Sequence, residues 1–166
     1  SYKKDITYIR VKNVKESMAI IGENFFQNPC QKINLIGVTG TNGKTSTVSF
    51  IKQILSYDCK VGSIGTIEIY DGEKTITSIN TTPESLDIQK NLNEMIKNNC
   101  KYCVMEVSSH ALVLNRIDSI DFEAAVFTNL TQDHLDFHKT LENYKNAKEK
   151  LFYKTKSINM FNIDDK

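Results

Sequence analysis

Short β-rich segments alternate with apolar stripes of helical spacing along most of the chain. Residues 33–38 form the first such segment, and Val48, Ile51 and Leu55 follow it at helical intervals. The same pattern predicts further strands at residues 102–107, 123–128 and 158–163, and a further helix at 141–152. Strands that alternate with helices indicate right-handed βαβ units. The predicted class is therefore α/β, a mostly parallel sheet flanked by helices.

One region breaks this alternation. Residues 61–70 and 74–79 both have an extended pattern, and the pair Asp71-Gly72 between them is a favoured hairpin turn. We therefore expect an antiparallel hairpin excursion beside the parallel strands.

Two helices flank these regions. Thr82 is predicted as the N-cap of the helix after the hairpin, with Pro83 at its first position and Glu84 in its first turn. The apolar stripe of that helix is Ile88, Leu92, Met95 and Ile96. Residues 1–32 are predicted to form a lead-in strand and helix. The apolar face of this lead-in helix is Val14, Met18 and Ile21.

Composition narrows the class of protein. The 166 residues correspond to one domain, and 40% hydrophobic with 25% charged residues is typical of a globular chain. A net charge of +1 gives no field for attracting nucleic acid or an anionic membrane. Without a long apolar run or a secretory signal, we expect a soluble, cytoplasmic protein with no membrane partner. The net charge gives the further expectation of no nucleic-acid partner, and we expect a monomer.

The four cysteines do not indicate a disulfide framework in a chain of this length. Cys100 and Cys103 form a C-x-x-C pair, but Cys103 falls inside a predicted buried strand and no second pair stands at zinc spacing. Core or rim thiols are the favoured interpretation over a metal or redox site.

A phosphate-binding loop is predicted between the first strand and its helix. Its residues are Gly40, Thr41, Asn42, Gly43, Lys44, Thr45 and Ser46. Glycines let backbone N–H groups approach phosphate oxygens, and the helix N-terminus adds favourable partial charge. Lys44 supplies a cation for the phosphates, and Thr45 is placed to reach Mg²⁺. The loop is a shortened variant, since Val38 stands where the usual pattern begins with glycine, and an ordinary glycine turn is the alternative.

Polar residues gather where the predicted strands end. Glu106 ends the strand at 102–107, where its carboxylate is expected to hold Mg²⁺ or, alternatively, to be solvated or cap a turn. Residues 128–138 carry two histidines, among them His134, and two aspartates. Loops at the carboxyl ends of parallel strands are expected to converge on one crevice. These loops are residues 39–45, 80–82, 106–110 and 128–138.

Lys148 is predicted to face inward. On a helical wheel it lies within the apolar stripe of Leu141, Tyr144, Leu151 and Phe152. Burial lowers the pKa of a lysine and leaves a neutral amine that is able to react with CO₂ to give a carbamate. Periodicity alone favours the alternative, in which the amine reaches the surface.

Together these residues resemble the Mur ligase family, most closely its MurE type. The matching segments are GVTGTNGKTST (37–47), IGT (64–66), NTTPE (80–84), MEVSSHAL (105–112), Arg116, VFTNLTQDHLDFH (126–138) and YKNAK (144–148). Several motifs in the same order over residues 33–163 make a chance match improbable. EVSSHAL with TTPE points to the MurE branch.

The resemblance implies an ATP-dependent ligase of peptidoglycan synthesis that adds the third amino acid to UDP-N-acetylmuramoyl-L-alanyl-D-glutamate. ATP phosphorylates the substrate carboxylate, and the incoming amine attacks the acyl phosphate. By position, residues 40–46 bind ATP. The implied catalytic residues are Lys44, Glu106, His134 and Lys148. The implied metal ligands are Thr45, Glu106, His134 and Lys148 as a carbamate. The implied substrate-binding residues are Thr81, Thr82, Ser108 and Arg116, whereas Leu114 replaces a glutamine that some members use.

The resemblance also implies a domain organisation. Residues 33–166 correspond to the central ATP-binding domain, truncated at its end, and residues 1–32 lead in from a largely missing first domain. The C-terminal domain that selects the amino acid is absent, so the sequence does not indicate which amino acid is added. We expect no turnover by the chain alone.

Other functions stay open at this point. Another ligase of the same fold, such as folylpolyglutamate synthase or another Mur ligase, would differ in its substrate segment. A non-catalytic nucleotide-binding module would have no chemical need for Lys44, Glu106, His134 and Lys148 together. A kinase or GTPase is disfavoured by the shortened loop and by the lack of an NKxD-like guanine motif.

Overall fold

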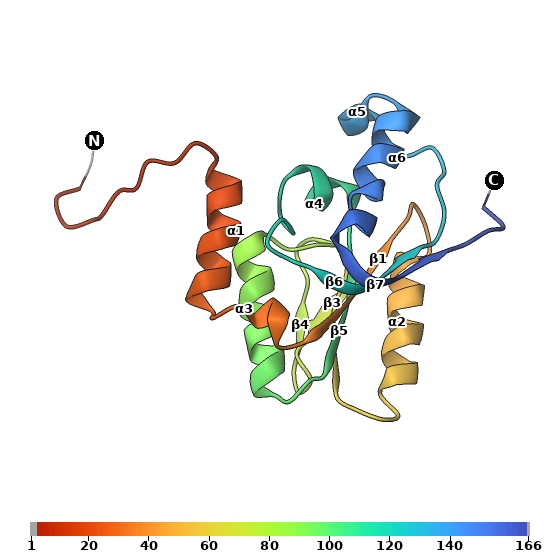
Figure 1. Ribbon diagram of the computed structural model, residues 1–166, viewed down its shortest axis with the longest axis horizontal. Coiled ribbons are helices and arrows are strands. Elements are labelled where there is room, and N and C mark those ends of the chain that lie inside the picture. Colours follow the sequence, from red (N-terminus) through yellow and green to blue (C-terminus); the bar gives the residue numbers. More distant parts are fainter. Residues whose placement is uncertain (1–2, 166) are drawn as a thin grey trace.

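The computed structural model describes residues 3–165 and places one mixed sheet between layers of helices (Figure 1). Its strands are β1 Asn34–Thr39, β2 Val61–Ile64, β3 Glu68–Tyr70, β4 Thr75–Thr77, β5 Tyr102–Glu106, β6 Phe122–Phe127 and β7 Thr155–Phe161. The order across the sheet is β4-β3-β2-β5-β1-β6-β7. Strands β2, β5, β1, β6 and β7 are parallel, while β3 and β4 are antiparallel additions at one edge. The predicted α/β class and its hairpin excursion are confirmed.

The helices cover both faces of this sheet. They are α1 Val14–Phe25, α2 Lys44–Leu55, α3 Ser85–Lys97, α4 Ser109–Val113, α5 Leu135–His138 and α6 Leu141–Glu149. Single 3₁₀ turns, η1 Pro29–Gln31 and η2 Phe152–Lys154, precede β1 and β7. Helix α2 lies on one face, α3 lies on the other with α1 outside it, and α4, α5 and α6 gather at the carboxyl ends of the parallel strands, at the top of Figure 1.

Alternating strand residues fill two apolar clusters, one on each face of the sheet. In β5, Cys103 and Met105 join the cluster under α3, whereas Val104 joins the cluster under α2. This is the period of two expected for a strand with both faces covered. The predicted helical stripes are confirmed on both faces. They are Ile88, Leu92 and Met95 in α3, all 0% exposed, and Val48 in α2 with Ile51 and Leu55 packed beside it.

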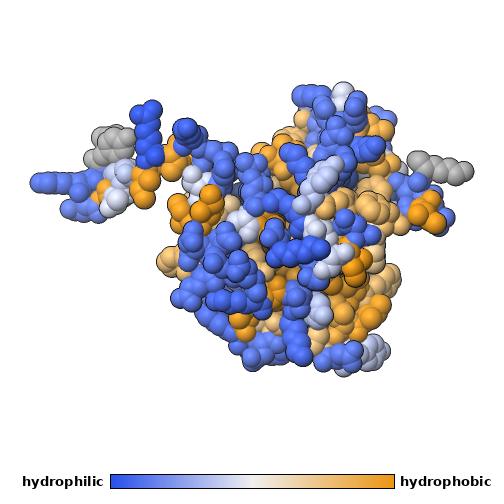
Figure 2. Space-filling model, viewed as in Figure 1, coloured by the Kyte–Doolittle hydropathy of each residue, from blue (hydrophilic) through white to orange (hydrophobic). Residues whose placement is uncertain are grey.

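The lead-in region differs from its prediction. Residues 3–13 form neither strand nor helix, and α1 is the first regular element among the described residues. Helix α1 buries Ala19 and Gly22 instead of the predicted face, because small residues let it approach α3 closely. The predicted face is largely exposed: Val14 at 66%, Met18 at 38% and Ile21 at 50%. Figure 2 shows hydrophobic side chains along this helix.

Several predicted boundaries were also wrong. The strand predicted at 158–163 is β7 Thr155–Phe161, and the helix predicted at 141–152 ends at Glu149. The extended stretch 61–70 is two strands, since the chain turns at residues 65–67 and β3 pairs antiparallel with β2. Helix α3 begins at Ser85 with Glu84 as its N-cap, not at Thr82. Thr82 does not cap this helix because its buried hydroxyl donates to the backbone oxygen of Glu106 at 2.9 Å.

Cys100 and Cys103 are core thiols, one of the two placements predicted for them. All four are free, and Cys100 and Cys103 are buried. Burial raises the pKa of both thiols, which disfavours the thiolate that metal binding or redox exchange requires. Within residues 3–165, no helix is long and apolar enough to cross a membrane.

Candidate functional site

The loops predicted to converge do meet at the carboxyl ends of the parallel strands. Hydrogen bonds join the loop after β1 to the loop after β6, and the loop before α3 to the loop after β5. The order of strands reverses beside β1, which is where open α/β sheets bind ligands. The loop between β1 and α2 therefore lies where it can contact a bound phosphate.

Two glycines give this phosphate loop its shape. Gly40 has φ +151° and Gly43 has φ +81°, conformations that residues with a side chain rarely adopt. A Cβ on Gly40 would also collide with the Thr128 hydroxyl, whereas one on Gly43 would meet nothing within 4 Å. The close contact with Thr128 and the backbone conformation both require glycine at position 40. At position 43 only the backbone conformation requires it.

The loop after β6 holds the phosphate loop in place. The Asn129 side chain accepts from the Asn42 N–H at 2.9 Å and donates to the Asn42 oxygen at 3.0 Å. Thr41 Oγ1 accepts from the Thr131 N–H at 3.0 Å, and the Thr41 N–H donates to the Asn129 backbone oxygen at 2.9 Å. The sequence motif contained Asn129 but gave it no role. The structure identifies it as the clamp on the loop.

Two lysines converge on one backbone oxygen of the loop. Nζ of Lys148 donates to the Gly40 oxygen at 2.7 Å, and Nζ of Lys44 donates to the same oxygen at 3.0 Å and to the Thr41 oxygen at 2.8 Å. Lys148 is only 3% exposed, so the inward-facing prediction is confirmed and the surface alternative is wrong. Burial, reinforced by the charge of Lys44, lowers the pKa of Lys148 to about 7. Burial also lowers the pKa of Lys44.

Tyr144 connects Lys148 to the rest of the site. Its ring lies 4.3 Å from Nζ of Lys148, and its hydroxyl donates to Thr41 Oγ1 at 3.3 Å. The aromatic face favours the charged amine, whereas burial favours the neutral amine. The sequence placed Tyr144 in the apolar stripe of α6 but did not anticipate this contact.

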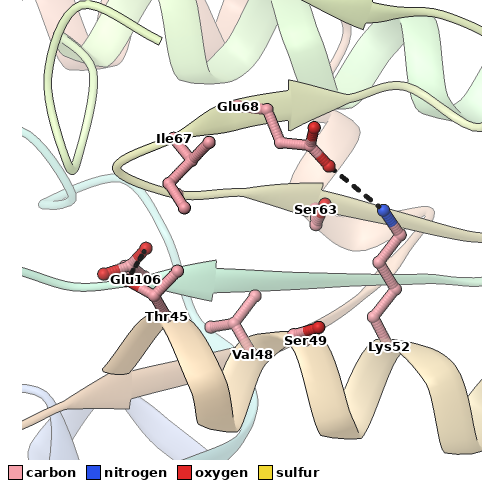
Figure 3. Close-up of a pocket in the computed structure, with 9 residues that line it drawn as sticks. Thr45, Val48, Ser49, Lys52, Ser63, Ile67, Glu68 and Glu106 are labelled. Carbon is pink, nitrogen blue, oxygen red and sulfur yellow. Dashed lines mark hydrogen bonds and ion pairs between the residues drawn. The ribbon is translucent and has the colours of Figure 1, made fainter. Parts of the chain in front are cut away.

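The Glu106 carboxylate lies at the first turn of α2. Thr45 Oγ1 donates to Glu106 Oε1 at 3.0 Å, and both residues line a cavity of about 290 Å³ between α2 and the β2–β3 turn (Figure 3). Figure 3 shows these two side chains at one end of the cavity and the ion pair of Lys52 with Glu68, 3.7 Å apart, at the other. Glu106 as a whole residue is 1% exposed. Its oxygens and the Thr45 hydroxyl are the hard donors that Mg²⁺ prefers.

Thr66 holds this carboxylate from the opposite side. Its N–H donates to Glu106 Oε1 at 2.8 Å and its hydroxyl donates to Oε2 at 3.1 Å. A Cβ on Gly65 would lie 2.6 Å from Oε1, so the glycine provides room for the carboxylate. Sequence reasoning missed Thr66, although the segment IGT contained it.

Three of the residues predicted to bind substrate, Thr81, Thr82 and Ser108, belong to a hydrogen-bond network that includes Glu106. Thr81 Oγ1 lies 3.0 Å from Thr66 Oγ1. Thr82 is fully buried, and its hydroxyl accepts from the Ser108 N–H at 3.0 Å. Thr82 therefore supports the loop that carries Ser108. Ser108 Oγ caps α4 by accepting from the Ala111 N–H at 3.2 Å.

Arg116 lies beside this segment and is only partly satisfied. It donates to the Thr82 oxygen at 2.9 Å and forms an ion pair with Glu84 at 2.6 Å. Its buried Nε has no acceptor among the described residues. A guanidinium with a spare N–H donor is well suited to bind a carboxylate.

All three histidines of the chain form one cluster. The ring of His110 lies 4.9 Å from that of His134 and 5.6 Å from that of His138. His138 is buried, with Nε2 2.9 Å from Ser109 Oγ. Burial lowers the pKa of His110 and of His138, which favours neutral rings at neutral pH. His134 has φ +52° and is half exposed, beside Asp133 at 3.5 Å.

The predicted metal ligands are not all brought together. Thr45 and Glu106 are in contact, whereas the ring of His134 lies 6.0 Å from the ring of Tyr144, which in turn packs on Lys148. In the part of the chain that the structure describes, no group of three or more histidine, cysteine, aspartate or glutamate residues is arranged to hold a metal ion.

Known proteins share this sequence and fold. A UDP-N-acetylmuramoyl-L-alanyl-D-glutamate--2,6-diaminopimelate ligase of Clostridioides difficile (strain 630) is 58% identical over 98% of this chain. A solved ligase of the same description superposes with a TM-score of 0.76 at 31% identity, covering 96% of this chain and 34% of that one. A Mycobacterium tuberculosis folylpolyglutamate synthase complexed with ADP and AMPPCP superposes with a TM-score of 0.65 at 14% identity, covering 87% of this chain and 41% of that one, and shares the fold.

The chain spans about a third of the length of the curated relatives that it matches, 34% for the Clostridioides difficile ligase. The family model described as the Mur ligase middle domain matches residues 38–166, which include the phosphate loop, Glu106, the histidine cluster and Lys148. Because that match covers most of the chain, the chain belongs to the Mur ligase family.

Proposed function

We propose that this chain is the ATP-binding, phosphoryl-transferring part of a ligase that joins 2,6-diaminopimelate to UDP-N-acetylmuramoyl-L-alanyl-D-glutamate. The observation that carries the proposal is the phosphate loop, with Thr45 and Glu106 in contact at its end and the segment 80–84 beside them. The substrate and the amino acid are those in the names of the similar ligases. Residues 33–166 are proposed as the central domain of a longer protein.

The loop residues are proposed to bind the phosphates of ATP. Backbone N–H groups of residues 40–46 and the N-terminus of α2 attract the phosphate oxygens. Lys44, which bonds to loop oxygens in this structure, has only to swing its Nζ outward to contact the β- and γ-phosphates. Asn129 keeps the loop open by holding Asn42 from behind.

Thr45 and Glu106 fit a Mg²⁺ ion by the chemistry of their donors. Mg²⁺ binds through one or two carboxylate oxygens together with substrate phosphates and water, and a hydroxyl and a carboxylate face the same cavity here. When bound, ATP and Mg²⁺ supply the activated phosphoryl group and neutralise its charge. The side chains of the site are then proposed to hold the substrate carboxylate in line with the transferred phosphoryl group.

Lys148 and His134 are proposed to complete the site. A neutral Lys148 amine bonds to CO₂ and releases a proton, which turns a cation into an anionic oxygen donor. The lowered pKa of Lys148 and its place behind the phosphate loop support this proposal. His134 is proposed as a further metal ligand. Its exposed ring would have to reorient to reach the metal.

The substrate is proposed to lie against residues 80–84 and Arg116. The spare Nε donor of Arg116 fits a substrate carboxylate that displaces or shares the contact with Glu84. Thr81 and Ser108 present hydroxyls on the same side. Thr82 acts through its buried contacts with Glu106 and Ser108.

Product formation by the full-length protein tests this function. We would incubate it with Mg-ATP, the UDP-muramoyl dipeptide and 2,6-diaminopimelate, then measure phosphate release and the mass of the product. Amide formation that is lost in Lys44→Ala supports the proposal. Parallel reactions with a folate and glutamate test the alternative ligase, and product formation only in those reactions would overturn it.

A further inference from the structure

A continuous line of hydrogen bonds runs from the phosphate loop to the segment proposed to bind substrate. Thr45 donates to Glu106 Oε1 at 3.0 Å, Thr66 donates to Glu106 Oε2 at 3.1 Å, and the hydroxyls of Thr66 and Thr81 are 3.0 Å apart. Each step lies within ordinary hydrogen-bond distance. Glu106 is therefore shared between the two proposed binding sites.

The direction of these bonds follows from the donors available. A carboxylate only accepts, and a threonine hydroxyl has one proton to donate. If the Thr66 proton goes to Glu106, the Thr66 oxygen accepts from Thr81. A substrate group that recruits the Thr81 hydroxyl thus alters the bond to Thr66, and through it the carboxylate beside Thr45.

The surrounding structure makes this line a rigid one. The Thr66 N–H donates to Glu106 Oε1 at 2.8 Å. The carboxylate fits closely against Gly65, since a Cβ at that position would lie 2.6 Å from Oε1. Thr82 holds the backbone of Glu106 at 2.9 Å. Movement of the segment 80–84 is therefore transmitted to the backbone of Glu106 through Thr82 and to its carboxylate through Thr66.

We propose that Thr66 is a positioning residue that couples the nucleotide site to the substrate site through its hydroxyl. The inference rests on the proposed function, because it needs a nucleotide at the loop and a muramoyl dipeptide at residues 80–84. Coupling of this kind is reciprocal, so each ligand changes the affinity for the other by the same factor.

Calorimetry on the full-length protein measures this factor. The dissociation constant of Mg-β,γ-methylene-ATP is measured with and without saturating UDP-muramoyl dipeptide. Wild type is expected to show a coupling of at least about fivefold. Thr66→Val, which keeps the N–H bond but removes the hydroxyl, should reduce the factor to about one. Thr66→Ser should restore it, a rescue that a purely steric role of the side chain would not produce.

Two further variants complete the test. Thr81→Val breaks the same link without touching Glu106 and is expected to lose the coupling as well. Thr77→Val removes an exposed hydroxyl from β4 and should leave it intact. Equal coupling in wild type and Thr66→Val, or no coupling in a wild type that binds both ligands, would overturn the inference and leave the proposed function standing. Wild type that binds neither ligand would overturn both.

Discussion

At the scale of single residues, the site contains two ionisable side chains that are almost fully buried. Lys148 and Glu106 are 3% and 1% exposed, and each is satisfied by partners far away in sequence. Lys148 bonds to Gly40, 108 residues away, and Glu106 bonds to Thr66, 40 residues away. Buried ionisable groups cost stability unless they are paired, and they are typical of sites that use their shifted protonation.

Lys148 gives a prediction about pH. Its pKa is about 7 in the folded protein against 10.5 ordinarily, so the unfolded chain binds more protons between these values. The stability that this residue contributes therefore rises with pH across that window and is lost as the pH falls toward 7. Relative to Lys148→Met, the wild-type free energy of unfolding should gain up to about 1.4 kcal/mol per pH unit from pH 7 to 10.

Urea unfolding in CO₂-free buffer at pH 7, 8 and 9 measures this difference. Lys148→Met should be at least as stable as wild type at pH 7, although it removes a proposed ligand. Lys150→Met, which alters an exposed lysine at the end of the same helix, is the matched control. A difference between wild type and Lys148→Met that stays constant with pH would contradict the buried, neutral amine.

What the sequence could predict at this scale was local. The periodicity of one helix placed Lys148 within an apolar stripe but by itself favoured an amine that reaches the surface, whereas the phosphate loop followed from seven consecutive residues. Thr66 and Asn129 escaped because their partners lie 40 and 87 residues away, at distances that only the fold closes. A polar residue in a loop gives no sign of which distant group it will hold.

At the scale of elements, the strand ends position the chemistry. The turn between β2 and β3 places Thr66, the loop after β6 places Asn129, and the first turn of α2 places Thr45. The sequence predicted most strands and helices because two-sided burial leaves a clear apolar pattern. It misplaced the ends of α3 and of the 61–70 stretch, where tertiary hydrogen bonds of Thr82 and the reversal into β3 override local preference.

Gly65→Ala tests the turn between β2 and β3. The added methyl would lie 2.6 Å from Glu106 Oε1, so the carboxylate must shift away from Thr45 and Thr66. We expect Mg-ATP affinity to fall by at least about tenfold, roughly 1.4 kcal/mol, in calorimetry. Gly22→Ala adds a methyl on α1, whose nearest neighbour is a flexible leucine atom at 3.3 Å, and serves as the control. Unchanged affinity in Gly65→Ala would refute the close fit of Glu106.

Leu92→Ala tests the packing of α3 on the sheet. Leu92 is 0% exposed in the larger apolar cluster, and its truncation should cost about 2–5 kcal/mol of unfolding free energy. Ile54→Ala on α2, where the side chain is 66% exposed, should change stability far less. Urea denaturation of both variants provides the comparison. Similar losses in the two would contradict the assigned core.

At the scale of the whole molecule, the chain has a mostly parallel sheet between helical layers, matches the Mur ligase middle domain, and spans about a third of its relatives' length. Hydrophobic side chains lie exposed on α1 and α2 (Figure 2), among them Phe25 at 75%, Phe50 at 63% and Ile54 at 66%. The function proposed above assigns phosphate and metal binding to this part of a longer protein.

The central claim is that the loop at residues 40–46 binds the phosphates of ATP. Calorimetric titration of the full-length protein with Mg-ATP tests it directly, with Mg-GTP and Lys44→Ala as controls. We predict saturable, magnesium-dependent binding of ATP that Lys44→Ala weakens by about 30-fold or more, the effect of about 2 kcal/mol expected for one charged hydrogen bond. ATP binding that Lys44→Ala leaves unchanged, or a preference for GTP, would contradict the account.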